Sequence, residues 1–366
     1  MTLDTPYRAI FCDLLTDQTL DILPLRDVTL DDFIGKPGSL SGTVPIPDAA
    51  IAARVRRVAE GRTAVYLERG GDLWWGGIIW TSTLASSERG VLTLGIQAAT
   101  FDSYAARRRI RKDLSYPATD QLEVARELWR ELQSAPGGDI RVDYGSETSG
   151  VLRKASWRDG DETPYSEALE QLAAPTDGFE HHIAVYRDPV TGERVRRLRL
   201  GSPRVRTGAT DLLLDRPGAI LSYAFPRDAT RGGTTARARG ASVNNNQAEE
   251  SRPLYSAEKV AGDLLAAGWP RVDLSSDHNE VGDRAALDSL AATELAEARG
   301  AVVIPEITVR LDGVVPPALL GRTARVRITD EWFPEGLDVR YRIIGCKVQP
   351  AERGRPDTAE LYLEVA

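Results

Sequence analysis

Two stretches of this chain resemble each other, and this internal repeat constrains the fold more than any other feature of the sequence. The first stretch contains four short segments: GRTAVYLE from Gly61, GIIW from Gly77, ERG from Glu88 and LTLGIQA from Leu92. The second contains four similar segments: GRTARVRI from Gly321, RIIG from Arg342, ERG from Glu352 and LYLEV from Leu361. The segments follow the same order in both stretches, so chance similarity in an Arg- and Gly-rich chain is the weaker explanation.

The spacing of the matched segments is nearly constant. Gly61 and Gly321 are 260 residues apart, Ile78 and Ile343 are 265 apart, and Glu88 and Glu352 are 264 apart. The step from 260 to 265 is consistent with a longer hairpin loop, Thr329–Leu337, in the second copy. Self-similarity at a fixed separation predicts a repeated architecture, and two copies predict a duplicated β-domain.

Residues 7–98 predict short strands separated by turns. The expected strands are Tyr7–Asp13, Thr19–Leu25, Asp27–Phe33, Ser39–Ile46, Arg62–Arg69, Leu73–Thr81 and Val91–Ala98. One segment, Asp48–Glu60, instead has helical spacing, and Asp48 can cap the helix. Strands this short and this closely spaced favour a barrel or a sandwich.

Residues 100–215 have a different pattern, typical of an α+β insert. Thr119–Gln133 predicts an amphipathic helix, and Thr163–Ala173 predicts a second helix capped by Thr163. Phe179–Arg187 and Arg194–Gly201 predict a hairpin.

Strands return after residue 215. Ala219–Phe225 and Thr234–Ala241 are expected to pair, and Ser256–Ala267 and Arg284–Arg299 are expected to be helices. The remaining expected strands are Val302–Leu311, Thr323–Thr329, Asp338–Gln349 and Ala359–Val365.

The predicted fold is therefore mainly β with α+β inserts, and it contains two related β-barrel domains. The expected first barrel covers residues 1–99, and the α+β insert covers 100–215. The expected second barrel covers 216–255 and 300–366, and a helical insertion of residues 256–299 interrupts it.

Cysteines and histidines are too few for a recognisable metal or disulfide site. Cys12 and Cys346 cannot form a disulfide framework or a Cys-only zinc site, so we expect buried free thiols. His181, His182 and His278 are scattered, and we expect ordinary polar positions. The first two are adjacent, so on a strand they point to opposite faces. No metal or other cofactor is predicted.

Carboxylates are densest in three short clusters: Asp31-Asp32, Asp159-Asp161-Glu162 and Glu249-Glu250. Each is expected to be a solvated turn or a helix cap, although a glycosidase-type pair stays open because it needs only a set carboxyl separation. A further segment, Asp273–Asp283, offers Asp277, Asn279, Glu280 and Asp283 as oxygen ligands for a hard cation. It lacks the spacing and the glycine of a calcium loop.

Three tryptophans, Trp74, Trp75 and Trp80, lie on one expected strand. Alternation places Trp74 and Trp80 on one face and Trp75 on the other. The favoured interpretation is that they fill the core. The alternative is that one face contributes to a subunit contact, where aromatic residues are enriched.

Charge and motifs exclude several functional classes. With 54 acidic and 46 basic residues, the net charge of −8 argues against a basic face that holds nucleic-acid phosphates. The sequence contains no GxxxxGK[ST], GxGxxG between strand and helix, HExxH or GxSxG motif. It also has no apolar run long enough for a membrane span and no recognisable signal peptide, so we expect no membrane anchor and synthesis in the cytoplasm.

Four segments carry a resemblance to a known family: ILPLRDVTLDDF (Ile22–Phe33), PGSLSGTVPI (Pro37–Ile46), DLWWGGIIW (Asp72–Trp80) and the C-terminal YRIIGCKVQPAERG…AELYLEV. Through them the chain resembles the tail hub proteins of tailed phages. This family includes trimeric baseplate hubs, the N-terminal region of tail-associated lysins, and minor tail proteins of phages of actinobacteria. The resemblance covers nearly the whole chain.

The resemblance implies a structural, non-enzymatic role in the tail tip or baseplate hub of a virion. It implies a homotrimeric ring in which two barrels per chain give a pseudo-sixfold ring. The implied partners are distal tail, tape-measure and tip or fibre proteins, and phage DNA that passes without specific binding. The alternatives are a tail-associated cell-wall hydrolase and a carbohydrate-binding tail module; the last expected strand, Ala359–Val365, leaves no room for an appended lytic domain.

Overall fold

The computed structural model describes residues 6–175, 177–242, 252–279, 281–303, 305–311, 313–352 and 354–365. The chain divides into two compact units. The first unit contains Met1–Tyr223 and Ile307–Ala366, and the second contains Ala224–Glu306. Among the described helices, none has both the length and the apolar character that a membrane crossing requires.

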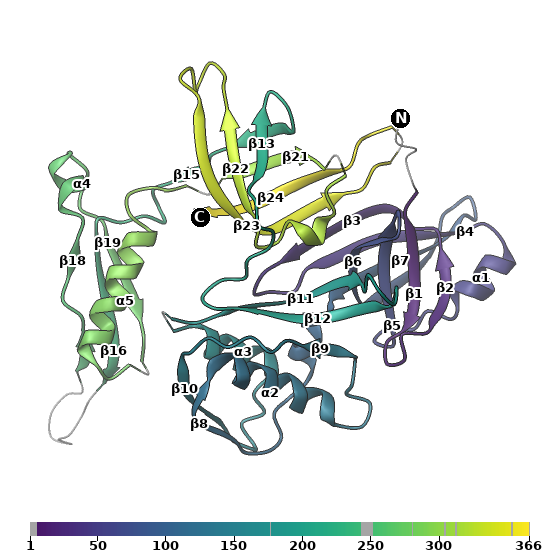
Figure 1. Cartoon of the computed structure of the whole chain (residues 1–366), viewed down its shortest axis with the longest axis horizontal. Coiled ribbons are helices and arrows are strands. Elements are labelled where there is room, and N and C mark those ends of the chain that lie inside the picture. The colour runs from purple at the N-terminus through teal and green to yellow at the C-terminus, as the bar shows by residue number, and fades with distance from the viewer. Residues whose placement is uncertain are drawn as a thin grey trace. The chain divides into compact units, whose positions relative to one another are not determined.

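A thirteen-stranded sheet runs through the first unit (Figure 1). Its N-terminal strands are β1 (Arg8–Asp13), β2 (Thr19–Leu23), β3 (Arg26–Phe33), β4 (Ser39–Ile46), β5 (Thr63–Arg69), β6 (Asp72–Ser86) and β7 (Leu92–Thr100). Its later strands are β13 (Leu212–Arg216), β14 (Ile220–Ala224), β21 (Glu306–Arg310), β22 (Thr323–Ile328), β23 (Leu337–Gln349) and β24 (Thr358–Val365). The expectation of a mainly β fold is confirmed.

The strand order repeats the duplication seen in the sequence. The first six-stranded group runs β3-β4-β7-β6-β5-β1, with β2 beyond β1, and the second runs β14-β21-β24-β23-β22-β13. The two groups join where β3 pairs with β23. One strand differs in direction, since β13 runs parallel to β22 whereas β1 runs antiparallel to β5. The strand path is open, and no closed barrel is found among the described residues.

A short helical element also recurs at the same place in both groups. In the first, α1 (Ala49–Val55) connects β4 to β5, and Asp48 caps it as expected, accepting a 2.8 Å hydrogen bond from the Ile51 amide. In the second, a 3₁₀ turn, η2 (Pro316–Ala318), connects β21 to β22. The matching order of strands and helical turns supports a duplication over the whole of each group.

Two backbone details strengthen this match. Gly61 and Gly321 both have positive φ angles, +73° and +77°. The Gly61 amide donates to the carbonyl of Ile79 at 2.7 Å, and the Gly321 amide donates to that of Ile343 at 2.8 Å. A β-bulge follows each acceptor, between Ile79 and Thr81 and between Ile343 and Gly345. Ile79, not Ile78, is therefore the structural counterpart of Ile343.

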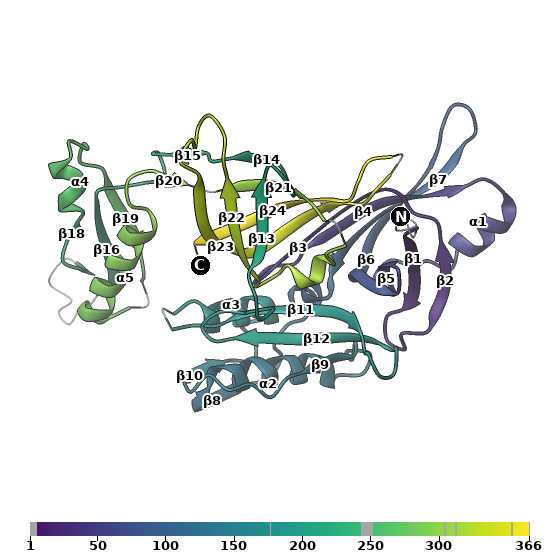
Figure 2. The ribbon, with the colours of Figure 1, turned by 45° about the horizontal axis from the view of Figure 1, so that its top comes forward.

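The segment after β7 forms an α+β layer against the first strand group. It contains η1 (Phe101–Arg107), β8 (Leu114–Asp120), α2 (Gln121–Ser134), β9 (Val142–Tyr144), β10 (Leu152–Trp157), α3 (Tyr165–Ala173), β11 (Glu180–Arg187) and β12 (Arg194–Gly201). The strands pair as β11-β12-β9 and as β10-β8. Figure 2 shows β11 and β12 running alongside α2 and α3.

One hydrophobic core joins this layer to the first strand group. It includes Ile10 and Tyr66 from the strands and Leu128, Trp129 and Ile183 from the insert. The helix starts differ slightly from the prediction. Helix α2 begins at Gln121 and not at Thr119, because Thr119 and Asp120 still pair in β8. Asp120 caps the helix and accepts a 2.9 Å hydrogen bond from the Leu122 amide.

The start of α3 also differs from the prediction. The cap residue is Pro164, one residue after Thr163, and no side chain makes a cap hydrogen bond. The Thr163 carbonyl accepts the Ile110 amide at 2.9 Å, which ties the start of this helix to the segment after η1.

The second unit has its own small sheet. Its elements are β15 (Arg227–Asp228), β16 (Thr235–Ser242), β17 (Pro253–Tyr255), β18 (Lys259–Val260), α4 (Gly262–Ala266), β19 (Asp273–Asp277), α5 (Arg284–Glu297) and β20 (Val302–Val303). β16 pairs with β17, β18 and β19. Helix α5 covers β16 through Leu287 and Ala291, which pack with Ala238.

Two sequence predictions in this region are wrong. The expected pairing of Ala219–Phe225 with Thr234–Ala241 does not form, because β14 joins β21 in the large sheet and β16 pairs inside the second unit. The expected helix Ser256–Ala267 is reduced to α4, because Lys259 and Val260 pair with β16 instead. Helix α5 agrees with the expected Arg284–Arg299.

The second unit is inserted at one defined point of the duplicated pattern. In the first group, β3 and β4 are joined by the short segment 34–38, whereas the counterpart strands β14 and β21 are separated by residues 225–305. The unit contains the expected insertion of residues 256–299 together with β15, β16 and β17. A loop in one copy has thus been replaced by a folded unit in the other.

Candidate functional site

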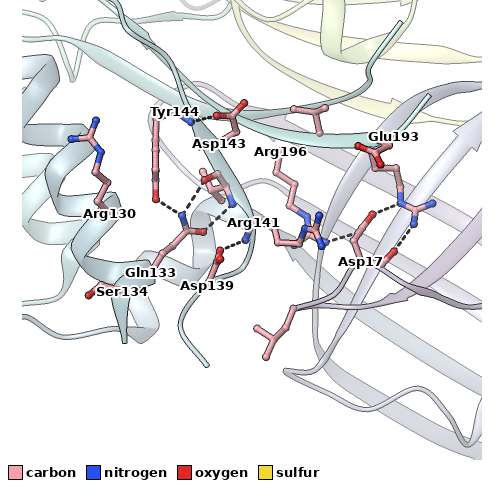
Figure 3. A pocket seen from close by; sticks show the side chains of 14 residues that line it. Asp17, Arg130, Gln133, Ser134, Asp139, Arg141, Asp143, Tyr144, Glu193 and Arg196 are labelled. Carbon is pink, nitrogen blue, oxygen red and sulfur yellow. Dashed lines mark hydrogen bonds and ion pairs between the residues drawn. The ribbon is translucent and has the colours of Figure 1, made fainter. Parts of the chain in front are cut away.

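A polar pocket of about 710 Å³ lies in the first unit, at the seam between the strands and the insert (Figure 3). Three segments form it: the β1–β2 turn, the end of α2 with the loop to β9, and the start of β12. Its lining residues are Leu15, Asp17, Arg130, Gln133, Ser134, Asp139, Arg141, Val142, Asp143, Tyr144, Glu193, Arg194, Val195 and Arg196. Many of the lining residues are charged, so the ion pairs among them determine which charged groups remain free to bind a ligand or to react.

Arg196 is the central residue of this seam. Its side chain is 2% exposed, and it lies 4.3 Å from the centre of the Phe101 ring. It donates to the Tyr66 hydroxyl at 2.7 Å, to the Leu14 carbonyl at 2.9 Å and to the Asp17 carboxylate at 2.7 Å. The buried guanidinium is therefore fully occupied in joining β12 to β5 and the β1–β2 turn.

Three of the four pocket carboxylates are held by structural partners. Asp17 accepts a second arginine, Arg194, at 2.8 Å, which ties the insert to the β1–β2 turn. Asp139 accepts the Arg141 amide at 2.7 Å, and Asp143 pairs with Arg197 at 2.6 Å, both within the insert. The pocket lining contains no histidine or cysteine.

A second polar connection lies at the other end of the insert. Arg342 of β23 is 2% exposed; it donates to Glu180 of β11 at 2.7 Å, to Glu364 of β24 at 2.6 Å and to the Val205 carbonyl at 2.8 Å. The insert is thus joined by a buried arginine to each strand group. Sequence alternation offered a signal for Arg196, which shares its parity with the buried Leu198 and Leu200, but we did not predict either arginine.

Both cysteines and His182 are buried, and His181 is half-buried. Cys12 and Cys346 are buried and unpaired, as expected, and burial raises the pKa of both thiols. His181 and His182 follow one another on β11, and burial lowers their pKa values to about 4 and about 3. Both imidazoles are therefore neutral near pH 7. Within the described ranges, the Nδ1 atoms of both are buried without a hydrogen-bond partner.

The prediction of solvated carboxylates is wrong for Asp32. Asp32 lies on β3 opposite the buried Cys346, and desolvation, with a contribution from Asp102, raises the pKa of Asp32 well above its usual value. Burial also raises the pKa of Asp102 to about 7. Asp31, which precedes Asp32 on β3, instead accepts a 2.9 Å hydrogen bond from the Ser39 hydroxyl. This bond closes the β3–β4 turn.

The other acidic clusters are exposed or have structural partners. Asp159, Asp161 and Glu162 lie in an exposed turn, as expected, and Glu162 is 3.3 Å from Arg111. Glu249-Glu250 lies outside the described residues.

The possible cation ligands between Asp273 and Asp283 are used elsewhere. Asp277 pairs with Arg239 at 3.1 Å, and Asp283 caps α5 through the Ala286 amide at 2.9 Å. Asn279 lies in an exposed turn, and Glu280 lies outside the described residues. Within the described ranges, no group of three or more metal-ligating side chains is gathered.

The three tryptophans belong to the core and its margin. Trp74 and Trp75 are 6% and 1% exposed, and the Trp75 indole donates to the Asp31 carbonyl at 3.0 Å. Trp80 is partly buried and donates to Ser103 at 2.8 Å. Register shifts fall beside Trp74 and at Trp80, so simple alternation does not assign their faces. These contacts favour the core interpretation.

Solved structures with the same fold are found among phage tail proteins. A tail protein from Neisseria meningitidis MC58 is 15% identical, with a TM-score of 0.62, and the match covers 98% of this chain and 96% of that chain. The 43 kDa tail protein of prophage MuSo2 from Shewanella oneidensis is 11% identical, with a TM-score of 0.62 and 98% coverage of both chains. This chain has the fold of phage tail proteins.

A third structure gives the same picture. The prophage tail protein gp18 from Listeria monocytogenes EGD-e is 12% identical, with a TM-score of 0.54, and the match covers 97% of this chain and 94% of that chain. No protein-family model and no curated protein sequence matches the chain. At these identities the likeness is one of fold, and one fold can carry many functions.

Proposed function

We propose that this protein is a structural component of a phage tail tip or baseplate hub. In this role it assembles as a homotrimeric ring that joins the tail tube to tip or fibre proteins and forms part of the path for DNA. The observation that carries the proposal is the duplication of the six-stranded group in a chain with the fold of tail proteins. The expected location is the virion tail.

The duplication gives a physical reason for a trimer. Two similar strand groups in each chain mean that three copies supply six similar groups. A ring of this kind presents pseudo-sixfold symmetry with only three subunits, and closed rings satisfy every subunit interface. Residues 100–215 then form one attachment to this ring. The second unit, which stands between β14 and β21 where the first group has only the β3–β4 turn, forms another.

Paired surface charge supports a passage that does not hold DNA. Three arginines of β22 and β23 each form an ion pair with an aspartate. The pairs are Arg325–Asp338 at 2.6 Å, Arg327–Asp215 at 2.7 Å and Arg340–Asp211 at 2.8 Å. Each arginine that binds phosphate releases counterions and adds affinity. We propose that the inner wall of the ring is neutral to negative, with arginines paired or directed outward.

The proposed role is non-enzymatic, and a turnover assay tests it against a cell-wall hydrolase. Purified full-length protein should leave peptidoglycan and host polysaccharide intact over long incubation. The matched variant is Asp161→Asn, which alters an exposed carboxylate in the turn before α3. Sustained cleavage by the wild-type protein that is lost in this variant would contradict the proposal.

A further inference from the structure

Within the chain, the two strand groups join along one strand edge. The half of β23 that follows its bulge pairs antiparallel with β3, with Gly345 opposite Phe33 and Val348 opposite Leu30. The Ile34 amide extends this junction with a 2.9 Å bond to the Ile344 carbonyl. Val348 and Leu30 are 0% and 1% exposed, so this face of the junction is closed to solvent.

The duplication places an equivalent edge on β6, and there it has no strand beside it. Counting from the shared bulge, Thr81 corresponds to Gly345 and Leu84 to Val348. In the described part of the chain, Thr81–Ser86 pairs only with β7. Leu84 is 67% exposed, whereas its counterpart Val348 is 0% exposed. Val348 has β3 beside it, and Leu84 has no described strand on the equivalent side.

The counterpart of β3 is β14, and β14 is also an open edge. It pairs with β21 as β3 pairs with β4, and it ends the strand path among the described residues. Its sequence, ILSYA, contains no charge and no proline, and neither does TSTLAS at Thr81–Ser86. Leu221 on β14 is 42% exposed. Edges without charge, proline or a cover are templates for pairing with another strand.

The other two edges of the described sheet, at β13 and β2, carry charged side chains. Within the described ranges β13 pairs only with β22, and it contains Asp215 and Arg216. At β2, the Arg54 side chain donates to the Ile22 carbonyl at 2.9 Å, and Arg57 donates to the Leu20 carbonyl at 3.4 Å. Arg54 also pairs with Asp21. Helix α1 thus covers the β2 edge with arginines, and this contrast marks β14 and Thr81–Ser86 as the edges left for a partner.

The two open edges do not pair with each other in this chain. Six strands lie between β14 and β6 in the sheet order, which corresponds to about 33 Å of sheet at the usual strand spacing. An edge that meets a different edge on the next copy makes a head-to-tail contact, and such contacts form a ring when the rotation between copies closes.

We propose that β14 of one copy pairs antiparallel with Thr81–Ser86 of the next copy, repeating the β3–β23 junction. The partner is a second copy of this chain, and this inference rests on the proposed trimeric ring. Each ring then contains three junctions within chains and three between chains, all of one type. Leu84 is covered by β14, as Val348 is covered by β3.

Engineered cysteines test the contact directly. Antiparallel neighbours bring Cα atoms within disulfide range, so Ser82→Cys is combined in turn with Leu221→Cys and with Ser222→Cys. The native Cys12 and Cys346 are buried and do not compete. Oxidation of at least one pair should give a covalent trimer on a non-reducing gel, and each single variant should stay uncross-linked. The control pair, Ser82→Cys with Ile22→Cys, uses the protected β2 edge and should not cross-link.

A charge at the edge gives a second readout. Leu84→Lys should weaken trimer formation roughly ten-fold or more without loss of folding, because this side chain is exposed in the single chain. Val190→Lys is the matched control, since Val190 is 91% exposed at the tip of the β11–β12 hairpin. Its trimer should form normally.

The outcomes separate the two proposals. A trimer that forms in Leu84→Lys and gives no cross-link in either cysteine pair would overturn the β14–β6 contact and leave the ring standing. Cross-linking through Ile22→Cys would also overturn it. A wild-type chain that stays monomeric at every concentration would overturn the ring itself.

Discussion

At the scale of single residues, buried charged groups do more to fix this molecule than exposed ones. Arg196 and Arg342 each use one guanidinium to join the insert to a strand group. A buried charge is tolerated only with full hydrogen bonding, and removing its partner leaves unsatisfied groups in the interior. The pairs on the surface are screened by solvent and contribute little.

Replacement of Arg196 should therefore be costly. Arg196→Met leaves the Leu14 carbonyl and the Tyr66 hydroxyl without this donor, and we expect a loss of about 2–4 kcal/mol of unfolding free energy. Arg197→Met, next to it on β12, removes a partly exposed pair with Asp143 and should cost about 1 kcal/mol or less. Urea unfolding compares them, and equal losses would contradict the role given to Arg196.

Asp102 should make stability depend on pH. Burial raises its pKa to about 7 in the folded protein, so the folded state holds a proton that the unfolded state releases above its ordinary pKa of 3.8. The stabilisation from this proton is present at low pH and is lost as the pH rises through about 7. Asp102→Asn should be more stable than wild type at pH 8, by one to a few kcal/mol.

The same measurement at lower pH provides the control. The advantage of Asp102→Asn should shrink as the pH falls from 7 towards 4, because wild-type Asp102 then becomes protonated. Urea unfolding of both proteins across this range measures the difference directly. An advantage that does not change with pH would show that the Asp102 carboxylate is not the cause.

At the scale of elements, bulges and glycine turns define the duplicated group. Gly61 and Gly321 hold the same positive-φ turn before β5 and β22, and each donates to the residue before a bulge. An alanine at positive φ is strained, and its cost also depends on what its Cβ meets. A Cβ on Gly321 would lie 2.7 Å from the Val205 carbonyl, whereas on Gly61 the nearest atom is 3.8 Å away, in Trp80.

The two glycines therefore give a matched comparison. Gly61→Ala should cost about 1 kcal/mol, the backbone strain alone, and Gly321→Ala should cost about 1–3 kcal/mol more. Unfolding free energies of the two variants measure this difference. A larger loss in Gly61→Ala would contradict the assigned environments.

The elements also show what could be predicted from the sequence. Ser39–Ile46 was predicted to the residue, because its alternation is clean and its ends carry turn residues. The face of Trp80 could not be predicted, because a bulge breaks the alternation at that point. The partners of β14 and β16 were also missed, since pairing between distant strands depends on contacts that no local pattern records.

The candidate site was harder to predict from the sequence than the fold. The repeat predicted a duplicated group, but the free edge at Leu84 emerges only when it is compared with the covered Val348. Asp32 was misassigned because a pair of aspartates before a turn resembles a solvated cap. Its burial comes from β23, which is more than 300 residues away in the chain.

At the scale of the whole molecule, the inserted unit should be separable from the sheet. The first strand group spans the same position with residues 34–38, so the second should tolerate this turn in place of residues 225–305. We expect a folded protein. The free energy of unfolding of its remaining unit should lie within about 1–2 kcal/mol of the wild-type value, because the entropy of loop closure changes slowly with loop length. We propose that the inserted unit contacts another tail protein, so this variant should fail to enter tails. Normal incorporation would contradict that role.

The mass of the intact assembly tests the central claim most directly. The chain has a mass of 40.0 kDa, and native mass spectrometry of the full-length protein should find a closed trimer of three times this mass. Images of the same sample should show a ring of threefold symmetry with six similar lobes. A particle that is monomeric or dimeric at every concentration, and in isolated tails, would contradict a trimeric hub built from duplicated strand groups.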